Sequence, residues 1–166
     1  MMKKLFFAFI AAAALCFSAS AKSLVVYFSV PESTKTSGLT RNEENSLVVV
    51  DEKALGNVQY VADLIADETG ADIFRLEAKD AYPTDHTALL NRAAREQRSN
   101  ARPEIRGKKI VPFTVHGGSG LAGTPRTITR LEPKAQVEQN AFSESRNTVD
   151  SCKERVSSWL KNIGEK

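Results

Sequence analysis

Short apolar runs alternate along the chain with longer amphipathic stretches. Residues 23–29 form a continuous run of aliphatic, β-branched and aromatic side chains between two serines, which predicts a strand buried on both faces. Similar runs predict strands at residues 71–77, 109–116 and 135–142, and a short inserted strand at residues 46–50. Because the strands alternate with helices, the pattern predicts an α/β domain built on a parallel sheet with right-handed crossovers.

Two helices are predicted where apolar residues recur at helical spacing. The apolar face of the first comprises Leu55, Val58, Val61, Ala62 and Ile65. The apolar face of the last comprises Val149, Cys152, Val156, Trp159, Leu160 and Ile163. Both stretches end at a glycine, Gly70 and Gly164, and glycine is the residue that most often follows a helix C-terminus.

Two further helices have recognisable start signals. Asp85 follows the turn residues Tyr82-Pro83-Thr84 and is a good N-cap. The helix that it opens is expected to turn four residues inward, namely Ala88, Leu89, Ala93 and Ala94. Thr124 is expected to cap the other helix, with Pro125 at its first helical position. The polar residues 31–45 predict a loop.

The first 21 residues have the features of a secretory signal peptide. Lys3 and Lys4 precede an apolar run, and Ala19 and Ala21 are the small residues that a signal peptidase requires. The run is short for a membrane span, so a membrane anchor or a buried helix is the less favoured interpretation. We expect cleavage after Ala21, export to the periplasm or the extracellular space, and no stable membrane insertion. Residues 22–166 then form one domain.

Composition limits the function classes. Charged residues make up 26% of the chain and hydrophobic residues 42%, as in ordinary globular proteins. Loss of Lys3 and Lys4 with the leader lowers the formal charge from +3 to +1, so charge indicates no nucleic-acid partner. Cys16 leaves with the leader, and Cys152 then has no disulfide partner in the mature chain. The chain's two histidines and two cysteines lack metal-ligand spacing, and we predict no metal site.

Two loops are candidate binding sites, because ligands of parallel sheets bind at the carboxyl ends of the strands. Gly56-Asn57-Val58 begins a predicted helix, whose free N–H groups favour a phosphate; an ordinary helix start fits these residues equally well. The second loop runs from His116 to Gly123, and its four glycines let backbone approach a flat ligand. Its residues 118–123 also match G-x-G-x-x-G, with Glu138 twenty residues on, which leaves a dinucleotide site as a weaker alternative.

The sequence predicts no catalytic side chain. His116-Gly117-Gly118 resembles an esterase oxyanion loop, but the chain has no G-x-S-x-G nucleophile elbow. Asp85 precedes His86 at a helix start, where capping explains the carboxylate without catalysis. Cys152 lies on the apolar face of its helix, which predicts a buried, unreactive thiol.

Taken together, these segments resemble the flavodoxin-like family, in particular its bacterial branch described simply as flavodoxin. The matching segments occur in family order over most of the mature chain and comprise residues 24–29, 56–58, 60–62, 82–85, 110–114 and 116–120. The resemblance implies noncovalent binding of FMN and electron transfer.

The resemblance also implies a set of FMN-binding residues. Ser29 and Gly56-Asn57 correspond to the two ends of a family phosphate loop that reads roughly Ser-x-Thr-Gly-Asn-Thr, and an insertion separates them here. Val58 stands where a threonine is usual, so one hydroxyl contact is lost. The loop that lines the flavin ring corresponds to His116, Gly117, Gly118, Ser119 and Gly120.

One departure from the family is large. Between Gly107 and Lys108 the family has a third strand, an aromatic flavin loop and a helix, which this sequence lacks. We expect a flavodoxin-like, doubly wound parallel sheet reduced to four main strands in the order 2-1-4-5, with helices on both faces. Without the aromatic wall, affinity for FMN should be well below the family norm or lost.

Two functions follow from this comparison. The first is an FMN-binding electron-transfer protein or a small flavin-dependent reductase, with FMN and an unidentified redox partner as its partners. The alternative is a degenerate flavodoxin-like domain that no longer binds FMN and has no catalytic role. The sequence does not separate an electron carrier from a reductase.

Overall fold

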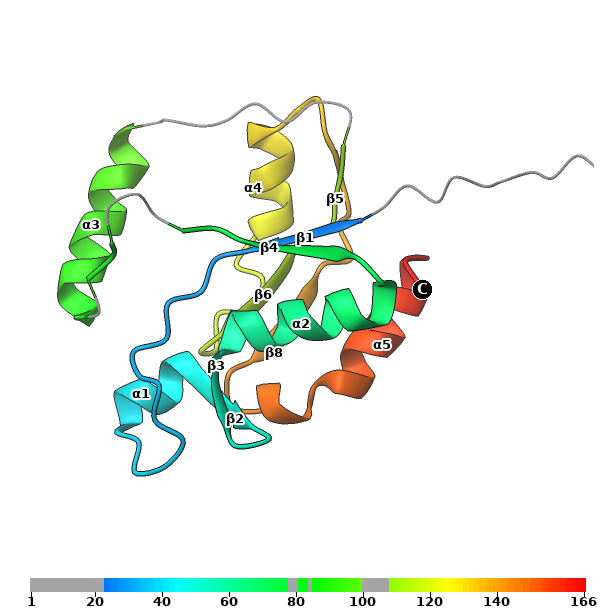
Figure 1. Ribbon diagram of the computed structural model, residues 1–166. Coiled ribbons are helices and arrows are strands. Elements are labelled where there is room, and N and C mark those ends of the chain that lie inside the picture. Colours follow the sequence, from blue (N-terminus) through cyan, green and yellow to red (C-terminus); the bar gives the residue numbers. More distant parts are fainter. Residues whose placement is uncertain (1–22, 78–80, 84, 100–107) are drawn as a thin grey trace, which may run out of the picture.

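The computed structural model describes residues 23–77, 81–83, 85–99 and 108–166, which form a mixed α/β structure (Figure 1). The predicted leader and most of the connector expected at residues 101–108 therefore lie outside the described residues. In chain order the elements are β1 (Leu24–Tyr27), α1 (Arg41–Ser46), β2 (Leu47–Val50), β3 (Lys53–Gly56), α2 (Asn57–Thr69), β4 (Asp72–Arg75), α3 (His86–Ser99), β5 (Lys109–Ile110), β6 (Phe113–His116), α4 (Thr124–Leu131), β7 (Gln136–Val137), β8 (Phe142–Ser145), the 3-10 turn η1 (Val149–Ser151) and α5 (Lys153–Asn162).

The strands pair two by two. β1 pairs with β4 in parallel, with Val25 opposite Ile73, and β6 pairs with β8 in parallel, with Phe113 opposite Phe142. β5 pairs with β7 in parallel, whereas β2 and β3 form an antiparallel hairpin. Two of the three neighbour pairs expected for the four-stranded parallel sheet, β1 with β4 and β6 with β8, are thus present. In the described part of the chain no hydrogen-bonded ladder joins β1 to β6, so the pairs form separate two-stranded sheets.

The β2–β3 hairpin corrects the predicted start of the helix that the structure shows as α2. Leu55 belongs to β3, where it lies opposite Val48, and α2 begins two residues later at Asn57. Asp51 and Glu52 connect the strands with φ angles of 48° and 62°, as a two-residue turn of type I′ requires. Asp-Glu is not the Asn-Gly or Asp-Gly pair that announces such a turn in a sequence, which is why the hairpin was not predicted. The helix ends as expected before Gly70, which has φ 65°.

Both C-terminal strand predictions were wrong in extent. Residues 109–116 form two short strands, β5 and β6, because Pro112 has no N–H to donate to a ladder. The carbonyl of Pro112 still accepts a hydrogen bond from Phe142 N–H at 3.1 Å. Residues 135–142 likewise divide, and β8 begins at Phe142 and continues to Ser145. The start of α4 also differs by one residue, since Gly123 is its N-cap and Thr124 its first helical residue.

The predicted loop at residues 31–45 contains part of a short helix, α1. Thr40 caps it: its side chain accepts from Glu43 N–H, and Glu43 accepts from Thr40 N–H at 2.7 Å. This reciprocal capping box is visible in the sequence as Thr-x-x-Glu, and it was the signal that the sequence analysis missed. These bonds and a bond from Lys35 lower the pKa of Glu43 to about 2.

The core lies between α2, α5 and one face of β1. Its largest fully buried side chains are Leu160, Val61, Val149, Val156 and Cys152. The residues predicted for the apolar face of the last helix are in the core, but Val149 lies in η1 and Cys152 is the N-cap of α5, and Ile163 is half-buried after its end. Figure 1 shows α2 and α5 side by side beneath the β1–β4 pair.

β1 is buried on one face only, which corrects the prediction of a strand buried on both. Val25 and Tyr27 are buried, whereas Leu24, Val26 and Phe28 are 59%, 43% and 41% exposed. α2 packs on the buried face, which carries Val25 and Tyr27. The other face is open because α3, the helix expected to pack inward, contributes no side chain to the core among the described residues.

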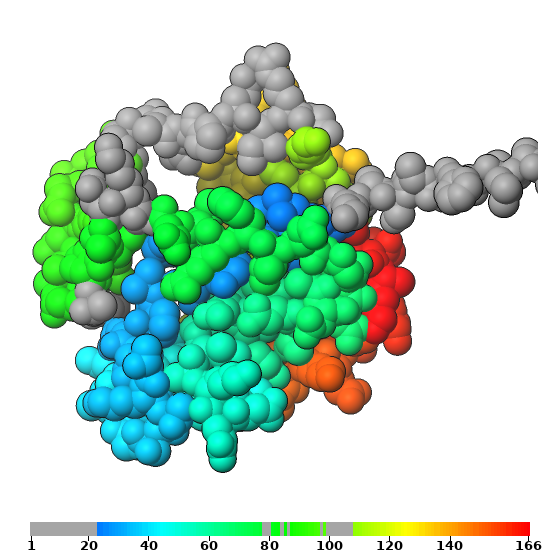
Figure 2. Space-filling model, viewed as in Figure 1, coloured from blue at the N-terminus to red at the C-terminus, as the bar shows by residue number. Residues whose placement is uncertain are grey.

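α3 forms a separate lobe beside the main body, as Figure 2 shows. Its predicted inner face is half-buried at Ala88, Leu89 and Ala94 and exposed at Ala93. The predicted N-cap is confirmed, because Ala88 N–H donates to Asp85 Oδ1 at 2.8 Å.

Candidate functional site

A cavity of about 360 Å³ opens where β1 and β6 end. This is the edge at which ligands of parallel sheets bind, and the volume falls within the range of small-molecule pockets. Its lining residues come from seven separate stretches of the chain: Phe28, Ser29, Val30, Glu32, Asn45, Ser46, Asn57, Val58, Tyr82, Pro83, Leu89, Val115, His116, Gly117 and Arg146. Five of the nine residues predicted to bind a cofactor line it, namely Ser29, Asn57, Val58, His116 and Gly117.

The first turn of α2 forms one wall of the cavity. Gly56 is the N-cap and has no side chain to accept from the first N–H groups of the helix, so these donors remain available. Asn57 is 6% exposed, and its Nδ2 donates to Asn45 O at 3.1 Å. Its Oδ1 is buried and has no hydrogen-bond partner. The wall therefore offers both donors and a spare acceptor.

Gly56 itself lies behind the cavity and sets the position of Ser29. A Cβ at Gly56 would collide with Ser29 Oγ and lie 3.2 Å from Ser29 Cβ. The Ser29 carbonyl accepts a hydrogen bond from Arg75 Nη2 at 2.9 Å, which holds the end of β1 against β4. The two ends of the predicted phosphate loop thus meet in space although residues 30–55 separate them in the chain.

The glycine loop contributes less than was predicted. His116 and Gly117 line the cavity, but Gly118, Ser119 and Gly120 do not. The loop turns back on itself after β6, and Gly118 N–H donates to His116 Nδ1 at 3.0 Å. Gly118 and Ser119 are exposed. The carboxylate of Glu138, which a dinucleotide would need at its ribose, accepts from Asn140 N–H at 2.9 Å.

Arg146 is the basic lining residue that the sequence analysis missed; Glu32, Asn45 and Tyr82 are among the other lining residues that were not predicted as site residues. Arg146 follows β8, and its backbone N–H donates to His116 O at 2.9 Å, which continues the pairing of β6 with β8. Its guanidinium packs against Gly117, where an added Cβ would lie 2.9 Å from Nη1. A phosphate site without a basic side chain was predicted, whereas the structure places a guanidinium in the cavity wall. No sequence signal marks Arg146, because only the β6–β8 pairing brings it to the cavity.

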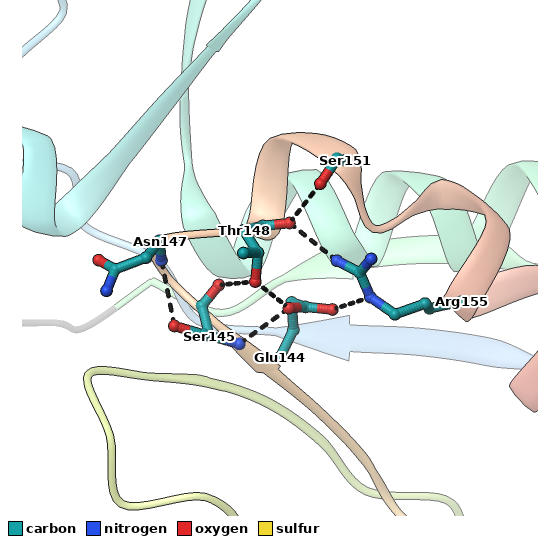
Figure 3. Close-up of polar contacts among 6 residues, drawn as sticks. All are labelled: Glu144, Ser145, Asn147, Thr148, Ser151 and Arg155. Atoms are coloured by element: carbon teal, nitrogen blue, oxygen red, sulfur yellow. Dashed lines mark hydrogen bonds and ion pairs between the residues drawn. The ribbon is translucent and has the colours of Figure 1, made fainter.

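A hydrogen-bonded cluster fixes the turn that carries Arg146 (Figure 3). The buried Glu144 carboxylate accepts from Thr148 Oγ1 at 2.6 Å, from Ser145 N–H at 3.0 Å and from Arg155 Nε at 2.7 Å. Arg155 Nη2 also donates to Thr148 O at 2.9 Å. Burial raises the pKa of Glu144, but the bonds from Arg155 and Thr148 outweigh it and hold this pKa below its usual value. Glu144 therefore stays ionised and pairs with Arg155.

Aromatic side chains cover another side of the cavity. The rings of Phe28 and Tyr82 meet edge to face with centroids 5.3 Å apart. Arg92 lies 3.9 Å from the Tyr82 ring centroid, and Tyr82 OH donates to Glu96 at 2.6 Å, which raises the pKa of Tyr82. These two rings give the cavity an aromatic surface.

The Cys152 thiol is buried away from solvent, as predicted. Its side chain is 0% exposed, and burial raises its pKa to about 11. A thiol in this state is a poor nucleophile. The described residues contain no group of three or more potential metal ligands. None of the helices in the described ranges is long and apolar enough to cross a membrane.

Comparison with known proteins found no match among family models, curated proteins or solved structures. The function is therefore argued from the geometry of the cavity.

Proposed function

We propose that the chain is an exported flavodoxin-like protein that binds FMN in this cavity and serves as an electron carrier or a small flavin-dependent reductase. One observation carries the proposal. Ser29, the first turn of α2 and the backbone at His116–Gly117 are distant in sequence but line one cavity at the ends of β1 and β6. These are the segments that the resemblance assigns to the phosphate and to the flavin ring.

The residues present fit such a ligand. The free N–H groups at Asn57 and Val58 favour a phosphate at a helix N-terminus. The unpartnered Asn57 Oδ1 can accept from a hydroxyl of a ribityl chain. The Phe28 and Tyr82 rings offer apolar surface to a flat ring system. The flavin would supply the redox chemistry, and the chain would bind it, orient it and tune its potential through nearby charges.

The same proposal extends to the sheet. We infer that the sheet has the order β4-β1-β6-β8, with β6 beside β1. In the strand numbering of the flavodoxin-like family this is the expected order 2-1-4-5. Two of its three neighbour pairs exist as parallel ladders, and α2 packs against both β1 and β6. A β1–β6 ladder in solution would satisfy the unpaired edges that both strands present. Amide exchange can test it: protection of Val26 and Val115 N–H groups supports the order, and fast exchange of both contradicts it.

The alternative is a degenerate domain without a cofactor. Val58 favours it, because an aliphatic side chain stands in the first turn of α2 where a hydroxyl would contact the phosphate. Glu32 favours it as well, since a carboxylate in the cavity lining repels an anionic ligand.

A titration of residues 22–166 with FMN separates the two functions. Saturable quenching of flavin fluorescence at micromolar concentrations or below supports the flavoprotein. Absence of quenching in a sample that unfolds cooperatively on heating supports the degenerate domain. Riboflavin, which lacks the phosphate, is the matched ligand control: weaker binding of riboflavin is expected if the α2 N-terminus holds the phosphate.

A further inference from the structure

Arg146 stands out among the described residues of the cavity because it alone carries a permanent positive charge. Its Nε is buried and has no hydrogen-bond partner. No carboxylate in the described ranges forms an ion pair with it, whereas the nearby Arg155 is paired with Glu144. A buried guanidinium N–H without an acceptor is costly. An anion that reached Arg146 would remove part of that cost.

The surroundings of Arg146 hold it in place without neutralising it. The backbone N–H of Arg146 donates to His116 O. Its guanidinium occupies the space that the missing side chain of Gly117 leaves. The Glu144 cluster fixes the following turn through Ser145 and Thr148 (Figure 3). A preorganised charge loses little side-chain entropy when it binds a ligand.

A second feature of the cavity also favours negative charge. The first turn of α2, a helix of 13 residues, presents its N–H groups to the same cavity through Asn57 and Val58. Asn57 is nine-tenths buried, and its Oδ1 lacks a partner. A ligand that satisfies Arg146, the helix N-terminus and Asn57 needs an anionic oxygen and a hydrogen-bond donor such as a hydroxyl. A phosphomonoester of a polyol has both.

We propose that Arg146 is the residue that makes the cavity selective for phosphomonoesters. Its guanidinium binds a phosphate oxygen, and the exposed Glu32 across the lining opposes the same anion. The proposal concerns the same cavity as the proposed function. It rests on that function only in identifying the bound phosphomonoester as FMN.

The test compares two charge-removing variants that should act in opposite directions. Arg146→Gln should weaken FMN binding about tenfold or more, as expected for a lost charge-assisted hydrogen bond, and leave riboflavin binding unchanged. Arg146→Lys should restore part of the loss. Glu32→Gln should strengthen FMN binding. Arg126→Gln is the control, because Arg126 is an exposed arginine on α4 that does not line the cavity. Equal weakening of FMN and riboflavin, or no change in either, would overturn the proposal.

A second measurement separates this proposal from the proposed function. Inorganic phosphate is titrated into the purified chain, and the arginine Nε–H resonances are followed by NMR, with Arg146→Lys used for assignment. A saturable shift of the Arg146 resonance supports the anion site. If phosphate shifts it but FMN does not bind, the flavoprotein is rejected while the anion site stands. If phosphate leaves the resonance unmoved and FMN binding does not depend on Arg146, the anion site is rejected.

Discussion

Gly56 and Ser29 lie in direct contact, so any side chain at position 56 would have to displace Ser29. A Cβ at position 56 would collide with Ser29 Oγ and lie 3.2 Å from Ser29 Cβ. Ser29 is 8% exposed and has little room to retreat. This contact joins the end of β1 to the start of α2 across the insertion between them.

Gly56→Ala should therefore destabilise the protein by overpacking. The φ of Gly56 is −62°, which alanine adopts without strain, so the cost arises from the collision alone. We expect a loss of about 1–3 kcal/mol in the free energy of unfolding. In a Ser29→Ala background the cost should be smaller, because the hydroxyl is gone. Urea unfolding of the four proteins measures the coupling; strictly additive effects would contradict the contact.

Val58→Thr should tighten FMN binding if the first turn of α2 holds the phosphate. Val58 is half-buried in the cavity lining, and threonine keeps its branched shape while adding a donor. One extra hydrogen bond is worth about 0.5–1.5 kcal/mol, which is roughly a two- to tenfold gain in affinity. Fluorescence titration measures it, and riboflavin affinity should not change. An equal gain for riboflavin would show that the hydroxyl acts elsewhere in the cavity.

Glu144→Gln should destabilise the protein in a manner that depends on pH. The folded state holds the pKa of Glu144 below its usual value, so the carboxylate stabilises the fold above the unfolded pKa. This contribution is lost as the pH falls through the folded pKa. We expect a cost of about 1–3 kcal/mol at neutral pH, since Arg155 is half-exposed and screening by solvent reduces its share.

The matched control for that prediction is Glu154→Gln, which changes an exposed carboxylate on α5. Thermal unfolding should show a difference between the Glu144 variant and the parent that shrinks from about pH 7 to about pH 3. The control should show little difference at either pH. A pH-independent cost would mean that the Glu144 side chain contributes packing rather than charge.

Phe142→Ala and Phe74→Ala form a pair that tests the open face of β1 and β4. Phe142 is 6% exposed and contacts Trp159 with ring centroids 5.3 Å apart. Its removal should cost about 3–5 kcal/mol. Phe74 is 56% exposed, and its removal should cost less than about 1 kcal/mol. Chemical denaturation compares the two variants, and a large cost at Phe74 would show that another segment covers this face in solution.

The sequence predicted the local elements well where hydrophobic periodicity was strong. The apolar faces of α2 from Val58 onward and of α5 follow from it, as do Gly70 at the end of α2 and the Asp85 cap. It also placed Cys152 in the core, because the residue lies on an apolar stripe. These predictions succeeded because each depends on neighbours within a few turns or strands.

Other features were decided only by tertiary structure. Leu55 has a place in the helical pattern of α2, but the turn at Asp51 and Glu52 places it opposite Val48 in a hairpin. The β1 run is apolar throughout, yet only one face is buried, because burial depends on which helix packs there. Arg146 carries no motif and reaches the cavity through the pairing of β8 with β6. The sequence by itself determined the approximate ranges of the main strands and helices and the caps at Gly70 and Asp85, since those choices arise from local sterics and periodicity. Which strand face is covered, and which distant side chains share the cavity, depends on long-range packing that no local pattern encodes.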